Sequence, residues 1–363
     1  MDFASLLDDV IQRGAGDLHL QAGRPPMIRV GGALTPAAEA ALTDDEIREI
    51  VRQISFEDAQ VRLDADRSVD FSFEIPGRAR FRVNAFFERG RLAAALRQIP
   101  PVIPAFDELN LPHAIKEIAL TPRGLVLVTG TTGSGKSTTL AAMIDAINTS
   151  RHDRIITIED PIEFVHQSKK ALVAQRELGG DTPSFLAALR VALRQDPDVI
   201  LVGELRDTET MRTALQAADT GHLVFSTIHT TNASQTVQRI IAMFPPDERE
   251  LLLQQLAGNL EGIISQRLAK TRDGKSRVPA VEIMRSSPVI RKLLREGEYA
   301  SIPRAIAGRE QGMQLFDQHL AWLWKAEIIS GTEALRLATN PEAVSMVMKG
   351  VSTADLAGGV LNS

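Results

Sequence analysis

Hydrophobic positions in the first hundred residues follow two different periods. Near the start of the chain they recur every three or four positions, which predicts a short helix with one apolar face. These positions are Phe3, Leu6, Leu7, Val10 and Ile11. Across residues 80–86 apolar and polar side chains alternate, which predicts a half-buried strand whose polar face is available for charge. Residues 69–73 and 92–99 predict its antiparallel neighbours, so we expect a small α+β domain over residues 1–99.

Beyond this domain the pattern changes. Prolines at positions 100, 101 and 104 disfavour regular secondary structure, because proline fixes its backbone and lacks an amide donor, so we expect a linker over residues 100–112. Unbroken apolar runs then alternate with helical patterns, as in parallel βαβ units. The runs are residues 125–129, 155–158, 199–202 and 223–227. We therefore expect an α/β domain over residues 113–363.

The end of this α/β domain carries a different pattern, and from about residue 288 it is expected to be helical. Phe316, Leu320 and Leu323 fall on one helical face, and Thr332 or Asn340 is suited to cap a helix start. Before this region, Asp273–Gly274 is a turn signal that predicts a hairpin.

Composition and charge narrow the function classes. The 363 residues are 44% hydrophobic and 24% charged, which fits a folded chain of two domains. We expect no membrane span, since no apolar run approaches the roughly 18 residues needed. The acidic start does not resemble a secretory signal, so we expect a cytoplasmic protein. The net charge of −5 disfavours a whole-surface nucleic-acid binder, and the lack of cysteine excludes disulfides, thiolate nucleophiles and cysteine-ligated zinc.

A glycine-rich segment between a predicted strand and a predicted helix matches the phosphate-binding loop. Residues 130–137 read Gly-Thr-Thr-Gly-Ser-Gly-Lys-Ser, the GxxxxGK[ST] pattern. In such loops backbone amides bind phosphate oxygens, the lysine reaches the β and γ phosphates, and the serine hydroxyl is a ligand of Mg²⁺. We therefore expect a nucleotide site with Ser137 as a metal ligand. Its expected residues are Thr131, Thr132, Gly133, Ser134, Gly135, Lys136, Ser137 and Thr138.

A carboxylate ends another predicted strand. Residues 199–202 are apolar and lead through Gly203 to Glu204. Nucleotides bind near the carboxyl ends of parallel strands, so Glu204 is expected to hold the metal shell or to accept a proton from the attacking water. The alternative is a surface acid that merely ends a core strand.

Acidic and histidine residues follow two further strands. Glu159, Asp160 and Glu163 come after the run at 155–158, and they either face the same crevice or form a solvated acidic turn. His222 and His229 flank the run at 223–227. His229, at the carboxyl end, is the better candidate for sensing phosphate, although a structural histidine fits the pattern equally well.

Together these segments resemble the type II/IV secretion ATPases. Residues 130–137 are similar to the family's Walker A motif, 158–163 to its Asp box, 201–207 to its Walker B motif and 220–230 to its His box, in the family's order. The resemblance covers essentially the whole chain and is strongest to the retraction ATPases of type IV pili. It implies a PAS-like N-terminal domain, a RecA-like P-loop ATPase domain, C-terminal helices, and a homohexamer that hydrolyses ATP with Mg²⁺ to drive pilus retraction and twitching motility.

The resemblance also implies roles for single residues. Glu204 is similar to the catalytic Walker B glutamate and is an expected metal ligand, and arginines of the N-terminal domain are expected to approach bound phosphates. The side chains implied to act in hydrolysis are Glu159, Glu163, Glu204, His229, Arg82 and Arg97, with Arg80 behind the two arginines. From the strand pattern alone, Arg82 fits a solvated strand face as well.

Residues 289–296 help to distinguish a principal retraction motor from an accessory one. They read Val-Ile-Arg-Lys-Leu-Leu-Arg-Glu, against the family's retraction motif Ala-Ile-Arg-Asn-Leu-Ile-Arg-Glu, so a principal retraction motor and an accessory paralogue both stay open. Extension ATPases typically carry a further N-terminal domain and a four-cysteine metal site, so this short chain without cysteine favours retraction. We expect a helix here with Ile290, Leu293 and Leu294 inward and Arg291, Lys292 and Arg295 outward.

The resemblance implies protein partners and no nucleic acid. The expected partners are identical subunits, a PilC-like platform protein of the inner membrane and a paralogous retraction ATPase, which would place the chain at the cytoplasmic face of that membrane. A nucleic-acid translocase is one alternative, since a basic stretch is present, although a solvated turn or docking surface explains it more simply. The stretch contains Arg267, Lys270, Arg272, Lys275 and Arg277. The second alternative is a nucleotide-dependent scaffold that does not hydrolyse ATP. The presence of Lys136, Ser137 and Glu204 argues against it.

Overall fold

The computed structural model describes residues 3–99 and 102–350 and separates into two compact units. The first unit contains Met1–Ile103, Ile158–Val165 and Gln175–Ala188, and the second contains Pro104–Thr157, His166–Ala174 and Leu189–Ser363. Two segments of the expected ATPase domain are thus grouped with the N-terminal residues. Of the expected linker, residues 100–101 lie outside the described residues, and residues 102–104 form no helix or strand.

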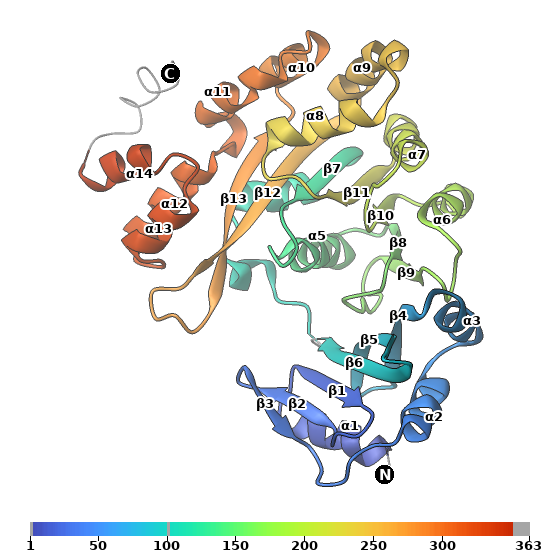
Figure 1. The fold of residues 1–363 in the computed structure, drawn as a ribbon. Helices are drawn as coiled ribbons and strands as arrows, with labels where there is room; N and C mark the ends of the chain where they lie inside the picture. Colours follow the sequence, from blue (N-terminus) through green and yellow to red (C-terminus); the bar gives the residue numbers. More distant parts are fainter. Residues whose placement is uncertain (1–2, 100–101, 351–363) are drawn as a thin grey trace. The chain divides into compact units, whose positions relative to one another are not determined.

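The first unit is built on an antiparallel sheet of order β3-β2-β1-β6-β5-β4 (Figure 1). The predicted alternation in β5 is confirmed, because Phe81, Val83 and Ala85 are buried and the residues between them are not. The predicted meander is also confirmed, since β5 pairs antiparallel with both β4 and β6. The bounds are α1 Phe3–Gln12, β1 Asp17–Gln21, β2 Met27–Val30, β3 Ala33–Pro36, α2 Asp44–Ile54, α3 Glu57–Asp66, β4 Ser68–Ile75, β5 Ala79–Glu88 and β6 Arg91–Ile99.

A seven-stranded sheet of order β13-β12-β7-β11-β10-β8-β9 contains the strands predicted for the α/β domain. Strands β12, β7, β11 and β10 are parallel neighbours, and β13 pairs antiparallel with β12. All residues of β7, β10 and β11 are buried, which explains their unbroken apolar runs. Figure 1 shows α5 on one face of this sheet and α7 and α8 on the other. The bounds are β7 Gly124–Thr129, β8 Arg154–Glu159, β9 Leu172–Glu177, β10 Val199–Val202, β11 Leu223–Ile228, β12 Leu260–Lys270 and β13 Arg277–Arg285.

Helices connect these strands and form the end of the described chain. Their bounds are α4 His113–Ala119, α5 Lys136–Ser150, α6 Phe185–Ala192, α7 Thr208–Asp219, α8 Ala233–Met243, α9 Arg249–Asn259, α10 Pro288–Arg295, α11 Ile302–Ala307, α12 Phe316–Lys325, α13 Gly331–Leu337 and α14 Pro341–Met348. Short 3₁₀ turns lie at Phe106–Leu109, Pro246–Glu248, Tyr299–Ser301 and Glu310–Gly312. Within the described residues no helix combines the length and the apolar character that a bilayer crossing requires.

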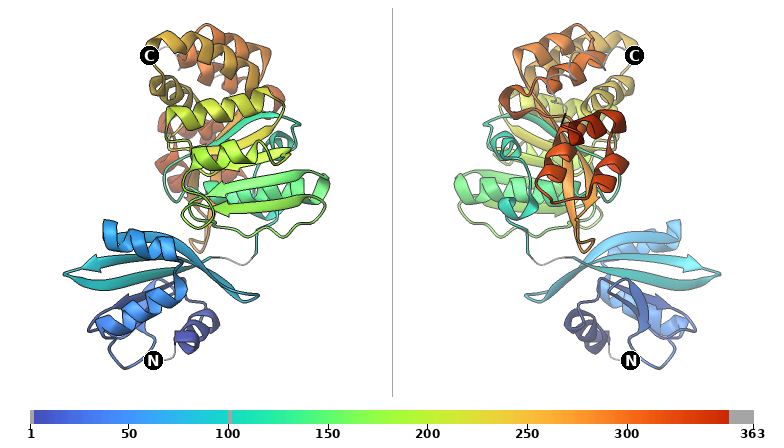
Figure 2. Two further views of the ribbon diagram at one scale, coloured as in Figure 1. Left: turned by 90° about the vertical axis from the view of Figure 1, so that its right-hand side faces the viewer. Right: turned by 90° about the vertical axis from the view of Figure 1, so that its left-hand side faces the viewer.

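Helices α12 and α13 pack on the β12–β13 hairpin, and α14 packs on these two helices (Figure 2). The hairpin turns at the predicted Asp273–Gly274. The apolar face predicted for α12 is confirmed: Phe316, Leu320 and Leu323 are buried. Asn340 caps α14 by accepting a hydrogen bond from the amide of Ala343. The prediction of Thr332 as a cap is wrong, because it lies inside α13, whose N-cap is Ser330.

The helix predicted over residues 289–296 is confirmed as α10. Ser287 accepts a hydrogen bond from the amide of Ile290, and Pro288 occupies the first turn, where its missing amide hydrogen costs nothing. Ile290 and Leu294 are buried, and Leu293 is half-buried. The three basic residues Arg291, Lys292 and Arg295 are exposed, as expected.

Candidate functional site

The phosphate-binding loop follows β7 and has the backbone that its sequence predicts. Gly130 and Gly135 have φ angles of 146° and 90°, which only glycine adopts without strain. A Cβ atom at Gly130 would lie 2.6 Å from the carbonyl oxygen of Gln266. Helix α5 begins at Lys136, so the unpaired amides of its first turn face the loop. This backbone fits a bound phosphate.

Side chains of the loop add a cation and hydroxyl groups. Lys136 Nζ donates hydrogen bonds to the carbonyl oxygens of Gly130 and Thr131 at 3.0 and 3.1 Å. Thr131, Thr132 and Gly133 are exposed, whereas Gly135, Ser137 and Thr138 are half-buried. Among the described residues the buried Ser134 Oγ has no hydrogen-bond partner. The ammonium, hydroxyl and amide groups together suit a nucleotide's phosphates.

Buried hydrogen bonds to β12 fix both ends of the loop. Thr129 Oγ1 donates to Ser265 Oγ at 2.9 Å, just before the loop. Gln266 Nε2 donates to Thr139 Oγ1 at 2.9 Å, in the first turn of α5. The loop is therefore held by the central sheet on one side and by its own helix on the other.

Glu204 and His229 leave the sheet at the same edge as the phosphate-binding loop. Strand β11 lies between β7 and β10, with Ile228 paired to Thr129 and Ser226 paired to Val202. Both residues therefore follow the carboxyl ends of neighbouring parallel strands, as Gly130 does. Glu204 Oε1 lies 3.5 Å from His229 Nε2, and Glu204 Oε2 accepts a hydrogen bond from Arg206 Nε at 2.8 Å.

The turn that carries Glu204 is tied to β11. Thr227 Oγ1 donates to the carbonyl oxygen of Gly203 at 2.7 Å, and the amide of Leu205 donates to the carbonyl oxygen of Thr227 at 3.2 Å. The Glu204 side chain is only 20% exposed. These bonds fix the direction in which its carboxylate leaves the strand, as a group that orients water requires.

His222 lies at the opposite end of β11. Its Nδ1 atom lies 2.9 Å from the carbonyl oxygen of Ala217 and 3.2 Å from Thr220 Oγ1. Ala217 belongs to the last turn of α7, and Thr220 is the residue that follows this helix. Of the two histidines in this segment, only His229 follows the carboxyl end of the strand.

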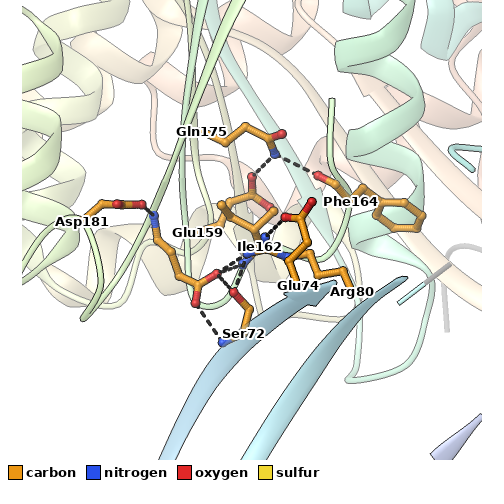
Figure 3. Close-up of polar contacts among 9 residues, drawn as sticks. Ser72, Glu74, Arg80, Glu159, Ile162, Phe164, Gln175 and Asp181 are labelled. Carbon is orange, nitrogen blue, oxygen red and sulfur yellow. Dashed lines mark hydrogen bonds and ion pairs between the residues drawn. The ribbon is translucent and has the colours of Figure 1, made fainter. Parts of the chain in front are cut away.

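The Asp-box segment, which we define as Ile158–Val165, belongs to the first unit. Glu159 Oε1 accepts a hydrogen bond from Gln175 Nε2 at 3.1 Å (Figure 3). Glu163 Oε1 lies 3.6 Å from Arg82 Nη1. Both carboxylates therefore have polar partners in their own unit, whereas Lys136, Glu204 and His229 belong to the second unit.

The three arginines singled out in the N-terminal domain lie on neighbouring strands of the first unit. Arg82 on β5 is paired with Arg97 on β6, and their side chains are 41% and 75% exposed. Arg82 Nε lies 3.5 Å from Asp70, and Arg97 Nε donates to Asp17 at 2.8 Å. Arg80 is buried further, at 15% exposure. The polar strand face is thus not purely basic, because each arginine faces a carboxylate.

Glu177 and Glu282 are buried glutamates that were not predicted from the sequence. Glu177 ends β9, a strand that was not predicted, and it carries no distinctive pattern. Glu282 lies on β13 and accepts a hydrogen bond at 2.8 Å from the amide of Ala233, the first residue of α8. Burial raises its pKa to about 7. The apolar run around Glu282 is the signal that would have indicated a buried carboxylate.

The described residues contain no cluster of three or more histidine or acidic side chains suited to a metal. The Ser137 hydroxyl and the Glu204 carboxylate are oxygen donors of the kind that Mg²⁺ takes together with substrate phosphates. The donor set of a hydroxyl and a carboxylate beside the phosphate-binding loop fits that mode.

Comparisons with known proteins agree with this geometry. The family model described as Type II/IV secretion system protein matches residues 3–311. A Pseudomonas aeruginosa protein named type IV pilus retractation ATPase PilT is 48% identical over 343 residues, which cover 94% of this chain and 99% of that protein. The type IV pilus ATPase PilU of the same species is 40% identical, with 98% and 93% covered. The crystal structure of the pilus retraction motor PilT with bound ADP matches at a TM-score of 0.87 and 43% identity, covering 94% of this chain and 98% of the other. The expected α/β ATPase fold is confirmed.

Proposed function

The chain belongs to the type II/IV secretion system protein family, and from this premise we propose that it is an ATPase motor that drives retraction of type IV pili. The observation that best supports ATP hydrolysis is that the phosphate-binding loop, Glu204 and His229 all follow strands at the same edge of the sheet. Identity of 48% to PilT against 40% to PilU favours a principal retraction motor over an accessory one.

The side chains divide the work of hydrolysis. Lys136 and the amides at the start of α5 bind the phosphates and neutralise charge that develops on them. Glu204 orients or deprotonates the attacking water, and His229, 3.5 Å away, orients that carboxylate. Mg²⁺ held by Ser137, Glu204 and the phosphates would supply further charge neutralisation.

We propose a homohexamer as the working form, made of an N-terminal domain over residues 1–99 and an ATPase domain over residues 113–363. Arg82 and Arg97 would approach the nucleotide bound by a neighbouring subunit, which suits their adjacent positions and exposed side chains. Glu159 and Glu163 of the Asp box would complete this site. Attachment to a PilC-like platform protein would hold the ring at the cytoplasmic face of the inner membrane.

Two of the five residues in the basic stretch make contacts within the chain. Arg267 Nη1 donates to the carbonyl oxygen of Leu337 at 2.6 Å, and its guanidinium lies 3.9 Å from the centre of the Phe316 ring. Arg272 Nη1 lies 3.2 Å from Glu327. These two side chains serve packing and pairing within the chain.

Glu204→Gln tests the proposed activity. We expect this variant to bind ATP but to hydrolyse it about 10² to 10⁴ times more slowly, the range for a lost general base. Lys136→Ala should lose hydrolysis and weaken binding, since the phosphates lose their counter-charge. Glu342→Gln, a change to an exposed glutamate of α14, is the matched control. Full turnover by Glu204→Gln would transfer its role to Glu159 or Glu163, and a wild type that does not hydrolyse ATP would refute the proposal.

A further inference from the structure

Glu177, the last residue of β9, places its buried carboxylate among donors from three separate parts of the first unit. Its Oε1 atom accepts a hydrogen bond from the amide of Ser72 at 3.0 Å. Its Oε2 atom accepts from Ser72 Oγ at 2.6 Å, from Arg80 Nη2 at 2.8 Å and from the amide of Ile162 at 3.2 Å (Figure 3). One carboxylate therefore joins β4, β5 and the middle of the Asp-box segment.

The ends of the Asp-box segment are held by the residues around Glu177. The amide of Leu178 donates to the carbonyl oxygen of Glu159 at 2.9 Å. Gln175 Nε2 donates to the Glu159 carboxylate and, at 2.8 Å, to the carbonyl oxygen of Phe164 (Figure 3). The end of β9 thus fixes both ends of the segment, and Glu177 fixes its centre.

Stability alone does not account for this arrangement. A buried ion pair is often no more stable than a well-packed apolar pair, because desolvation offsets the attraction. What four directed hydrogen bonds supply is a fixed position for the groups that donate them. One of the groups fixed here is the Ile162 amide, which belongs to the backbone between Glu159 and Glu163.

We propose that Glu177 is the positioning residue of the Asp box. It holds Ile162, and through it Glu159 and Glu163, in register with Ser72 and Arg80 of the N-terminal sheet. This inference rests on the proposed ATPase function, in which those two carboxylates act. A displacement of about 1 Å in such a group is enough to lower turnover by about 10²-fold.

Glu177→Gln tests the positioning role. Glutamine keeps the side-chain size but presents an NH₂ group to donors that need an acceptor. We expect kcat to fall about 10- to 100-fold while KM for ATP changes less than about twofold, since the phosphate-binding loop is untouched. Glu74→Gln is the matched control: Glu74 pairs with the same Arg80 at 3.0 Å and is exposed, so kcat should stay at the wild-type value.

Two further readouts separate positioning from a general loss of structure. In a background with both Glu159→Gln and Glu163→Gln, adding Glu177→Gln should lower kcat little further, because Glu177 acts through those two carboxylates. Amide hydrogen exchange at Ile162 should be faster in Glu177→Gln, with exchange in β7 unchanged. If Glu177→Gln does not fold, Ser72→Ala removes one of the four hydrogen bonds and should produce a smaller fall in kcat with the same faster exchange.

The outcomes distinguish the inference from the function on which it rests. A wild type without hydrolysis refutes the proposed function. An active wild type with an equally active Glu177→Gln overturns only the positioning role. A multiplicative further loss when Glu177→Gln is added to Glu159→Gln and Glu163→Gln overturns it as well. A parallel loss of ATP binding and of β7 protection would also overturn it, because Glu177 would then serve only stability.

Discussion

Replacing Glu282 by glutamine should remove a large part of the pH dependence of folding stability. Glu282 is 6% exposed on β13, and burial raises its pKa from 4.5 to about 7. Burial is the main cause; the hydrogen bond from the Ala233 amide and the charge of Arg267 act in the opposite direction, and Asp317 adds to the rise. The folded chain therefore keeps a proton on Glu282 at pH values where the unfolded chain has lost it.

The sign of the effect follows from which state binds more protons. Between pH 4.5 and about 7 the folded state binds the extra proton, so the free energy of unfolding falls as the pH rises through this window. A pKa raised from 4.5 to about 7 corresponds to about 3 kcal/mol. Glutamine cannot ionise, so Glu282→Gln should gain about 3 kcal/mol relative to the wild type when both are moved from about pH 4.5 to about pH 8.

Other buried groups titrate in the same range but cancel in this comparison. Burial lowers the pKa of His166 and of His319 to about 4, so both favour the folded state as the pH rises. They are present in both proteins. The difference between the two pH profiles therefore isolates Glu282.

The chain offers a local probe for this measurement. Its only two tryptophans, Trp322 and Trp324, both lie in α12, which packs against β13. Urea unfolding followed by tryptophan fluorescence, at steps from about pH 4.5 to about pH 8, therefore reports the region around Glu282. Parallel profiles for the wild type and Glu282→Gln would refute the reasoning, since they would mean that the pKa of Glu282 is the same in the folded and the unfolded chain.

Further predictions concern the ring and its coupling to the pilus. Arg82→Ala should lower ATP hydrolysis about 10³-fold, as expected for the loss of a phosphate-binding arginine. Mixing Arg82→Ala subunits with Lys136→Ala subunits should restore activity at mixed interfaces, and full activity of dilute monomers would contradict this. Changing both Arg291 and Arg295 to alanine should leave hydrolysis within about twofold of wild type, as for surface changes, yet impair twitching; equal loss of both activities would contradict it. Lys292→Asn should improve twitching if the chain is an accessory motor and leave it unchanged in a principal one.

The parts of the fold that the sequence predicted are those with strong local signals. The strands β7, β10 and β11 are unbroken apolar runs because they are buried on both faces. The glycines, lysine and serine of the phosphate-binding loop have a fixed spacing. Pro288 and Asn340 each mark the start of a helix, and their effect depends only on residues of the first helical turn. The prediction of Thr332 as a cap was wrong because Ser330, two residues earlier, is an equally good capping residue. Only the structure shows which of the two accepts the amide hydrogen.

The polar network of the Asp box could not be predicted from local patterns. Glu177 and Ser72 are 105 positions apart, and Arg80 is 97 positions from Glu177. Strand β9 has neither alternation nor an apolar run, since most of its residues are half-buried. Which carboxylate meets which arginine depends on the register of strands that pair across the fold, and a single sequence does not contain that register.

The way the chain passes back and forth between the two units limits how the protein can be divided or recombined. Cutting after residue 103 would separate the N-terminal sheet from Ile158–Val165 and Gln175–Ala188, which complete its unit. The isolated fragment would expose Ser72 and Arg80 without their acceptor, and the remaining chain would retain Glu177 as a carboxylate without its donors. A chimaera with a relative would therefore have to exchange residues 1–103, 158–165 and 175–188 as one set, because a single crossover point would leave an acceptor from one parent facing donors from the other.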